Sequence, residues 1–263
     1  MQEQQIKEKV KERYGKIALT GNSDCCCCSG VSEEEECASE NTPSPMQSVK
    51  TIGYDTKDIE SIPQNSILGV GCGAPTKFAD IRQGESVVDL GPGAGIDVFL
   101  AANKVGESGK IIGIDMTDEM LEKARKNAKD SNYTNVEFRK GDIEKRIPVD
   151  NNTVDLVISN CVINLTTDKV STFKEIYRIL KNAGGRMVIS DLITDREVKD
   201  RNSVNPEKWC SCIDGALTKE NYLQSITSAG FKNVSLLEER SYIEPDAADG
   251  RKISSLVIKA VKD

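Results

Sequence analysis

Short apolar runs alternate with amphipathic stretches from about residue 84 onward. The runs have the length of buried strands and comprise residues 86–91, 110–115, 154–160 and 184–191, and the more polar segment 136–142 is expected to form a strand between the second and third of them. The stretches between them with helical periodicity are residues 96–104, 117–129 and 168–181. Strands that alternate with helices of this length predict a doubly wound, mostly parallel α/β sheet with crossover helices on both faces.

The N-terminal part adds a helix to this pattern. Ile6, Val10, Tyr14 and Ile17 recur at three- and four-residue spacing, which predicts an amphipathic helix over residues 4–18. The following stretch has no hydrophobic period, and we expect a long loop over residues 20–48.

The C-terminal part adds two further strands. A helix is predicted over 218–229 and ends at Gly230. The apolar segments 234–243 and 253–261 are typical of an antiparallel pair, which we expect at the edge of the sheet.

Composition and charge narrow the class of function. The chain has 263 residues, a formal net charge of -7 and 38% hydrophobic residues, so it has enough apolar residues for a core. The negative charge argues against nucleic acid or an anionic membrane as partner. No run approaches a membrane span, and the first residues contain no apolar signal region, so we expect a soluble cytoplasmic protein.

Nine cysteines and the absence of histidine constrain the chemistry. The cysteine number is odd, and in a chain without an export signal these residues are expected to be thiols. A chain without histidine has no Ser-His-Asp or Cys-His catalytic set and no imidazole ligand for zinc. Sulfur and carboxylates are therefore the groups available for a reaction.

A glycine-rich loop follows the first strand of the sheet. The loop contains Gly91, Gly93 and Gly95, and it leads directly into a helix, so its backbone can approach a ligand closely. Asp115 ends the next strand, where its carboxylate can accept hydrogen bonds from two ribose hydroxyls. Asp89 precedes the glycines; a carboxylate there disfavours a pyrophosphate but suits a cationic group.

Three separate cysteines are expected near the same edge of the sheet. Cys161 directly follows the fourth strand, Cys72 lies in a glycine-rich segment upstream of the sheet, and Cys212 lies downstream of the fifth strand. Their spacing fits no zinc ribbon but suits a soft, three-coordinate ion such as arsenic(III), which keeps a lone pair on its open face. Alternatively, they are small buried apolar residues.

The order of motifs resembles that of the class I S-adenosylmethionine-dependent methyltransferases. The resemblance is carried by VVDLGPGAG at 87–95, GID at 113–115 and KGDIEKRIP at 140–148. It implies a Rossmann-like fold with S-adenosylmethionine as cofactor, and assigns the three loop glycines to the methionine moiety and Asp115 to the ribose. Further cofactor-binding residues implied are Asp142 and Ile143 beside the adenine, Met116 on the ring, Asp89 and Asn160.

Longer segments resemble the arsenite methyltransferases. They include GYDTKDIESIPQNSILGVGCGAPT, SNCVINLTTDK and GGRMVISDLITDRE. The resemblance implies arsenite or methylarsenite as substrate, methylated arsenicals as products in arsenic detoxification, and a thiol reductant such as thioredoxin or glutathione as partner. It assigns Cys72, Cys161 and Cys212 to arsenic. Cys210 is an additional thiol; motif position favours Cys212 over it as the ligand.

The sequence departs from this family at a few positions. Pro92 stands in the glycine loop where Ser or Cys is frequent, and Ala74 replaces a common asparagine. The N-terminal cysteine or cysteine pair of family members is replaced by a run of four, with Cys37 nearby: Cys25, Cys26, Cys27 and Cys28. This run is either a flexible arm that captures arsenite or an adventitious metal-binding segment.

These patterns divide the chain into three regions and leave three hypotheses for its function. We expect a helix and cysteine-rich arm over 1–60, an S-adenosylmethionine-binding domain over 61–195, and an arsenic-binding cap with the final strands over 196–263. The first hypothesis is methyl transfer to arsenite held by three thiolates. The alternatives are carbon or oxygen methylation of a small organic molecule, and a non-enzymatic metalloid-binding protein.

Overall fold

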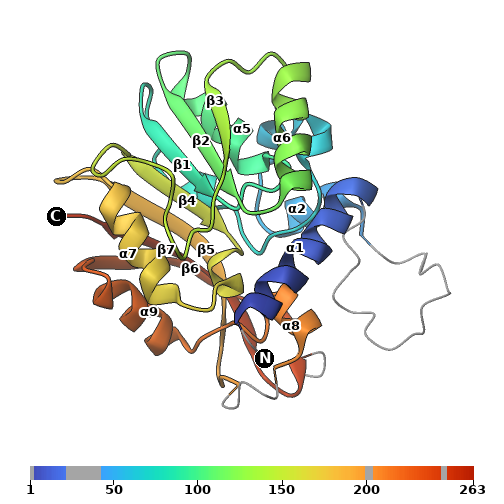
Figure 1. Cartoon of the computed structure of the whole chain (residues 1–263), viewed down its shortest axis with the longest axis vertical. Helices are drawn as coiled ribbons and strands as arrows, with labels where there is room; N and C mark the ends of the chain where they lie inside the picture. Colours follow the sequence, from blue (N-terminus) through green and yellow to red (C-terminus); the bar gives the residue numbers. More distant parts are fainter. Residues whose placement is uncertain (1–2, 22–42, 199–203, 244–247) are drawn as a thin grey trace.

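The computed structural model describes residues 3–21, 43–198, 204–243 and 248–263 (Figure 1). The helices are α1 (Glu3–Thr20), α2 (Pro45–Thr51), α3 (Thr56–Glu60), α4 (Pro75–Phe78), α5 (Ile96–Val105), α6 (Asp118–Asp130), α7 (Lys169–Ile179), α8 (Pro206–Cys210) and α9 (Lys219–Ser228), with the 3₁₀ turns η1 (Gln64–Ser66) and η2 (Ile163–Leu165). The strands are β1 (Ser86–Leu90), β2 (Lys110–Asp115), β3 (Val136–Lys140), β4 (Leu156–Asn160), β5 (Arg186–Thr194), β6 (Asn233–Ile243) and β7 (Ile253–Val261).

One mixed sheet of seven strands organises the molecule. Its order is β3-β2-β1-β4-β5-β7-β6; the strands from β3 to β5 are parallel, and β7 pairs antiparallel with both β5 and β6. This confirms the predicted doubly wound fold with its antiparallel C-terminal pair and N-terminal helix. The strand order reverses between β1 and β4, and ligands of such sheets bind outside the carboxyl ends of the strands at this point.

Alternating side chains of the strands build a core on each face of the sheet. Val87, Ile111 and Leu156 pack with residues of α5 and α6 on one face. Their neighbours Val88 and Ile112 pack with α7 and α9 on the opposite face. Most positions of β1, β2, β4 and β5 are therefore buried on one side or the other, which is why these strands are almost continuously apolar.

A third apolar cluster lies at the carboxyl end of the sheet. It joins Ile6 and Val10 of α1 to the buried Cys72, Cys210 and Cys212, and the half-buried Cys161 packs against it. In Figure 1, α1 and α8 lie together beside this end of the sheet. The N-terminal helix therefore packs against the segments that carry the described cysteines.

The predicted loop over 20–48 is wrong at its C-terminal end. Helix α2 begins at Pro45, and Ser44 and Gln47 form a capping box in which each side chain binds the other residue's backbone N–H. A capping box stabilises even a short helix that lacks apolar periodicity. The S-P-x-Q pattern is the local signal that hydrophobic periodicity does not detect.

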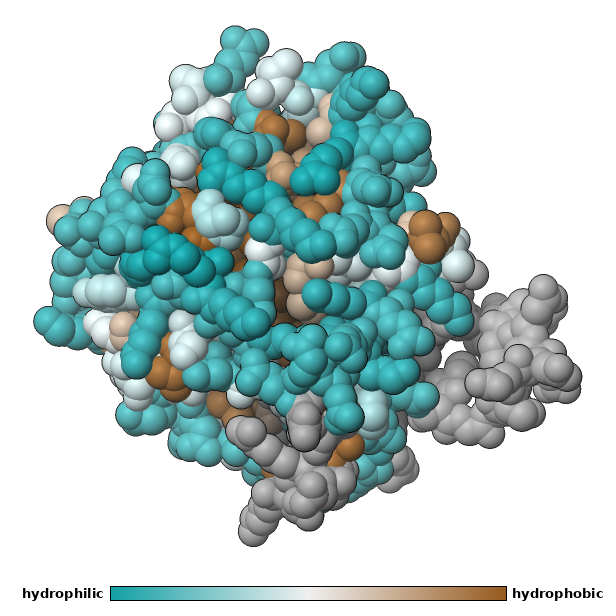
Figure 2. Space-filling model, viewed as in Figure 1, coloured by the Kyte–Doolittle hydropathy of each residue, from teal (hydrophilic) through white to brown (hydrophobic). Residues whose placement is uncertain are grey.

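The surface is hydrophilic over most of the face shown in Figure 2, with small, separate apolar groups. Single exposed apolar side chains of this kind are normal in folded proteins. Within the described residues, no helix is both long enough and apolar enough to cross a membrane. The predicted division into three parts stays a prediction.

Candidate active site

The glycine loop connects β1 to α5 at the point where the strand order reverses. Gly91, Gly93 and Gly95 all have positive φ angles, of 68°, 55° and 106°. A Cβ atom at Gly91 would lie 2.4 Å from a methyl carbon of Val162, so the residue must be glycine for both conformational and steric reasons. The loop therefore exposes backbone rather than side chains at the start of α5.

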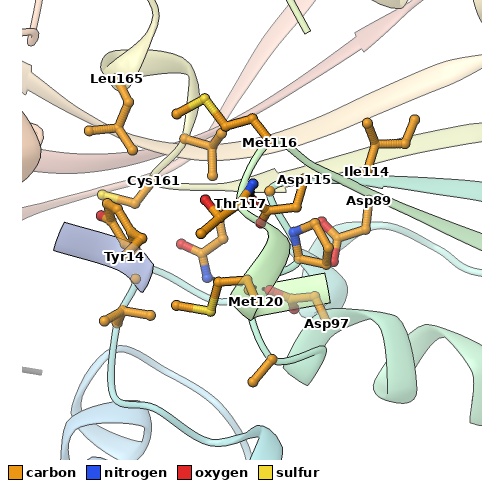
Figure 3. A pocket seen from close by; sticks show the side chains of 18 of the residues that line it. Tyr14, Asp89, Asp97, Ile114, Asp115, Met116, Thr117, Met120, Cys161 and Leu165 are labelled. Carbon is orange, nitrogen blue, oxygen red and sulfur yellow. Dashed lines mark hydrogen bonds between the residues drawn. The ribbon is translucent and has the colours of Figure 1, made fainter. Parts of the chain in front are cut away.

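A cavity opens beside this loop (Figure 3). Its walls come from α1, the glycine loop, and the segments that follow β2, β3 and β4. Most of the residues predicted to bind a cofactor line it: Asp89, Gly91, Gly93, Asp115, Met116, Asp142, Ile143 and Asn160. Cys161 also lines the cavity, whereas Gly95 lies behind the loop as the residue that caps α5. These segments are distant in sequence; the loops meet because their strands are neighbours in the sheet, and α1 packs against them.

Buried carboxylates define the polar part of the cavity. Burial, with the neighbouring charges of Asp97 and Asp115, raises the pKa of Asp89 well above its usual value. The Oδ2 atom of Asp89 is buried and has no hydrogen-bond partner within the described part of the chain. An unpartnered buried carboxylate oxygen is costly unless a ligand supplies a donor or a positive charge.

A second polar group links the cavity to the Cys72 loop. Asp97 accepts a hydrogen bond from the Tyr54 hydroxyl at 2.7 Å, and burial raises the pKa of Asp97 to about 6. Asn160 donates to the same hydroxyl at 2.9 Å and to the Gly73 carbonyl at 2.7 Å. Its side-chain oxygen accepts from the Cys72 backbone N–H at 3.1 Å. Asn160 therefore fastens the Cys72 loop to the end of β4.

The structure brings the predicted cysteines together at the end of β4. The Sγ atoms of Cys72 and Cys161 lie within 4.8 Å of each other and of a carboxylate oxygen of Asp191. The Cys212 thiol donates a hydrogen bond to the Cys161 carbonyl at 3.0 Å. Interactions with the Cys212 and Cys72 thiols, together with burial, raise the pKa of Cys161 well above its usual value. Cys161 is thus the central thiol of the three.

The backbone at two of these cysteines is in the left-handed region. Cys161 has a φ angle of 59° and Cys212 one of 64°. Residues other than glycine, asparagine and aspartate rarely adopt this conformation, and such strain is concentrated at functional sites. The backbone therefore holds both thiols in positions that an ordinary turn would not provide.

The Cys72 loop is held from the C-terminal hairpin. The Cys72 carbonyl accepts hydrogen bonds from Arg240 Nη2 at 2.8 Å and from the Ser255 hydroxyl at 2.6 Å. Arg240 also binds the Ile52 carbonyl at 2.8 Å, at the end of α2. One guanidinium thus connects β6, α2 and the Cys72 loop.

The remaining cysteines differ in position. Cys210 is buried at the end of α8, and burial raises its pKa to about 11. Its carbonyl accepts a hydrogen bond from the Tyr14 hydroxyl at 3.3 Å. The Cys210 thiol is not in the group formed by Cys72, Cys161 and Asp191. The candidate arm of Cys25, Cys26, Cys27, Cys28 and Cys37 lies outside the described residues.

Known proteins share both the sequence and the fold. Residues 81–230 match the family model described as a methyltransferase domain. Over 98% of its length the chain is 40% identical to the arsenite methyltransferase of Halobacterium salinarum, 67% of which it covers. The chain belongs to the arsenite methyltransferase family. This family member also resembles the human arsenite methyltransferase, with 38% identity over 50% of the chain and 37% of the relative.

A solved structure extends the similarity of this arsenite methyltransferase family member to three dimensions. The arsenic(III) S-adenosylmethionine methyltransferase of Chlamydomonas reinhardtii superposes with a TM-score of 0.65 at 31% identity. The match covers 84% of this chain and 74% of that structure. The chain spans 56% of the curated relative from Aquipseudomonas alcaligenes and 67% of the one from Halobacterium salinarum.

Sequence patterns did not indicate several residues around the cavity of this family member. Lys7, Val10 and Tyr14 of α1 line it, although the sequence predicted only that this face of α1 would be buried. Asp191 lies within the GGRMVISDLITDRE segment and Asp97 lies just after the glycine loop, but the sequence patterns assigned neither residue to the site. Asp97 is one position into α5 and Asp191 lies within β5, and only the packing of distant segments turns them toward the site.

Proposed function

We propose that this chain transfers methyl groups from S-adenosylmethionine to trivalent arsenic bound by Cys72, Cys161 and Cys212. The observation that carries the proposal is the meeting of thiols from three separate segments around Cys161, which itself lines the glycine-loop cavity. Thiolates are the ligands that soft ions prefer. A soft substrate at these thiols lies next to whatever the cavity binds.

The cavity residues fit S-adenosylmethionine. Asp89 offers a buried, unpartnered carboxylate oxygen, which suits a cationic ammonium group. Asp115 ends β2, where its carboxylate is placed for ribose hydroxyls, and Asp142 and Ile143 follow β3, where they suit the adenine. When bound, this cofactor would supply an electrophilic methyl group for attack by the arsenic lone pair, with S-adenosylhomocysteine as the leaving group. The attack converts trivalent to pentavalent arsenic, and a thiol reductant would supply the two electrons that return it to the trivalent state.

The chain's contribution to such a reaction is mainly positioning. Arsenic(III) held by three sulfurs keeps its lone pair on the open face, so no side chain has to remove a proton from the attacking atom. This fits a chain without histidine. The left-handed backbone at Cys161 and the hydrogen bonds that fix Cys72 hold the thiols in place before substrate arrives, which lowers the entropic cost of aligning the reactants.

The primary test uses methyl-labelled S-adenosylmethionine with a thiol reductant, with and without arsenite, followed by separation of the arsenic species. We expect label in methylated arsenicals only when arsenite is present. Cys161→Ser removes the central thiol and is expected to lower the rate roughly a hundredfold or more. Cofactor affinity, measured by calorimetry, should change less than about threefold because the glycine loop is untouched.

Cys210→Ser is the matched control, because it removes a buried thiol outside the central group. It should keep most of the activity. If Cys161→Ser methylates arsenite at the normal rate, arsenic is not bound as proposed. If the chain binds cofactor but arsenite is never methylated, methylation of an organic acceptor becomes the better hypothesis.

The reductant and the cellular setting are part of the same proposal. The four described cysteines are free thiols although Cys72 and Cys161 are close together, which fits a reducing compartment such as the cytoplasm. A thiol reductant of the thioredoxin or glutathione type would keep them reduced between turnovers.

A further inference from the structure

Asp191 is a third potential ligand beside Cys72 and Cys161. One of its carboxylate oxygens and the two sulfurs lie within 4.8 Å of one another, and within the described ranges this is the only such group of three cysteine, aspartate or glutamate ligands. Asp191 belongs to β5 and is completely buried, as is Cys72. Arsenite binding by three thiols does not use this carboxylate.

The hydrogen bonds of Asp191 leave it able to bind a cation. Oδ2 accepts from the Asn164 N–H at 3.0 Å and from the Tyr222 hydroxyl at 3.1 Å, while Oδ1 accepts from the Leu192 N–H at 3.0 Å. A carboxylate has about four acceptor positions, so at least one remains. The three existing bonds fix the orientation of the group, as donors around metal-binding carboxylates commonly do.

The charges around this group suit a divalent ion. Lys169 is buried near this group, and its charge interacts favourably with that of Asp191. Two thiolates and one carboxylate contribute three negative charges, so a divalent cation together with the Lys169 ammonium brings the total to zero. Arsenic(III) bound by three thiolates is neutral by itself, and the Asp191 carboxylate and the Lys169 ammonium then balance each other, so the charges are compatible with either ligand and the position of the carboxylate is what favours the divalent cation.

We propose that Cys72, Cys161 and Asp191 form a binding site for a thiophilic divalent cation such as Cd²⁺ or Zn²⁺. In a tetrahedral zinc site with bonds of about 2.3 Å, two sulfur ligands lie about 3.8 Å apart, so the three groups need to approach by about 1 Å or less. Three protein ligands leave one position of a tetrahedral ion for water, as in open zinc sites.

Binding such a cation has a defined consequence for methylation, which rests on the proposed function. The cation displaces the thiol protons of Cys72 and Cys161 to solvent and occupies two of the three sulfurs that arsenite needs. A d¹⁰ cation such as Cd²⁺ or Zn²⁺ has no lone pair that can attack a methyl group. These cations are therefore expected to be dead-end inhibitors that compete with arsenite but not with S-adenosylmethionine.

The test compares two substitutions with opposite expected effects. The background is the full chain with Cys25, Cys26, Cys27, Cys28 and Cys37 replaced by serine, so that these thiols bind neither probe; a phosphine serves as reductant. Cd²⁺ or arsenite is titrated against the fluorescence of Trp209, the only tryptophan, whose Nε1 binds the Leu165 carbonyl at 3.0 Å. The ultraviolet charge-transfer absorption of cadmium–thiolate bonds gives a second readout of Cd²⁺ binding.

Asp191→Asn should weaken Cd²⁺ binding at least tenfold and change arsenite affinity less than threefold. Cys212→Ser should do the reverse. Asp155→Asn is the matched control, because it changes a carboxylate at the opposite end of β4 that binds the Ser86 N–H, and both affinities should stay the same.

Several results would overturn the site. Equal Cd²⁺ affinity in Asp191→Asn and the background would show that the carboxylate is not a ligand. If Asp191→Asn weakens the binding of Cd²⁺ and of arsenite equally, Asp191 has a purely structural role. If Cys212→Ser abolishes Cd²⁺ binding, the cation is bound by the three thiols and not by Asp191. If Asp191→Asn does not fold, competition between Cd²⁺ and arsenite in the background protein provides the test, and absence of competition rejects the proposal. Methyl transfer is measured in a separate assay, so failure of the proposed methylation reaction can be distinguished from failure of the proposed cation site.

Discussion

At the scale of single residues, the site contains both strained backbone conformations and buried ionisable side chains. Cys161 and Cys212 occupy left-handed backbone conformations, which cost about 1–2 kcal/mol for a residue with a Cβ atom. Asp89, Asp97, Asp191 and Lys169 are buried ionisable groups within a small volume. Each is unfavourable for stability by itself, and together they are typical of sites where function opposes stability.

The cost of burying an ionisable group can be tested at Lys169 through the pH dependence of stability. Burial lowers its pKa from 10.5 to about 8, so between these values the unfolded chain binds a proton that the folded chain does not. Stability therefore rises with pH through this window. Lys169→Met removes the titrating group. The free energy of unfolding of the unsubstituted chain minus that of Lys169→Met should increase by up to about 3 kcal/mol between pH 8 and 10.5.

Urea unfolding of both proteins under a phosphine reductant, at several pH values, measures this difference directly. Background titration of the cysteines is common to both chains and largely cancels. Parallel stability curves would mean that Lys169 titrates normally and that its surroundings are wetter than the structure shows.

At the scale of elements, the C-terminal hairpin contributes to the site although it contains none of the cysteines. Strands β6 and β7 complete the sheet, and from them Arg240 and Ser255 bind the Cys72 carbonyl. The hairpin thus supports the loop that carries one of the three thiols. Residues that fix ligand-bearing loops in this way commonly tune affinity without contacting the ligand.

Replacing Arg240 tests this supporting role. Arg240→Ala removes the hydrogen bonds to the carbonyls of Cys72, Ile52 and Thr51. Loss of about 1.4 kcal/mol of positioning energy would raise the KM for arsenite about tenfold. The KM for S-adenosylmethionine should remain within about twofold, because the cavity does not contact this side chain.

Lys259→Ala is a suitable control for Arg240, since it lies on the same hairpin and binds the exposed Asp80 carboxylate at 3.0 Å. It should leave both KM values unchanged. An equal rise of both KM values in Arg240→Ala would indicate general loss of structure, and Arg240→Lys should restore part of the arsenite affinity if one hydrogen bond is recovered.

At the scale of the whole molecule, α1 closes the cavity from the far end of the chain. Lys7 forms ion pairs with Glu3, Asp142 and Glu144, and only 10% of its side chain is exposed. Burial opposes the charged form of Lys7, but the hydrogen bonds that its ammonium donates to Glu144, Asp142 and Glu3 outweigh burial and raise the pKa of Lys7 above its usual value. The helix is thus fixed to the segment after β3 by charge as well as by apolar contacts.

Lys7→Met should leave the Asp142 and Glu144 carboxylates without their shared cation. Breaking a largely buried pair by removing one partner is destabilising, and we expect a loss of about 2 kcal/mol in the free energy of unfolding. Cofactor affinity should fall as well, because Lys7, Asp142 and Glu144 all line the cavity. Urea unfolding and calorimetric titration with S-adenosylmethionine measure the two effects.

Lys9→Met on the same helix is the control, because Lys9 pairs with Glu12 on the exposed side of α1 at 2.8 Å. Its stability and cofactor affinity should match the unsubstituted chain. If Lys7→Met also matches it, α1 is held by its apolar face alone, and the ion pairs contribute nothing measurable.

The sequence alone determined the order of helices and strands, the glycine loop and the position of Cys161. These features depend on local periodicity and on residues adjacent in the chain, such as glycines directly after a strand. It also predicted that Cys161 would lie at the carboxyl edge, because a parallel strand ends immediately before it. The roles of the individual cofactor and arsenic residues stay predictions.

Only the tertiary structure decided which distant groups meet. Lys7 reaches Asp142 across 135 positions, and Arg240 reaches Cys72 across 168. The approach of Asp191 to two thiols likewise has no sequence pattern, because it depends on the pairing of β5 with β4 and on the path of the Cys72 loop. Such contacts follow from packing of the whole chain, and no local pattern of side chains specifies them.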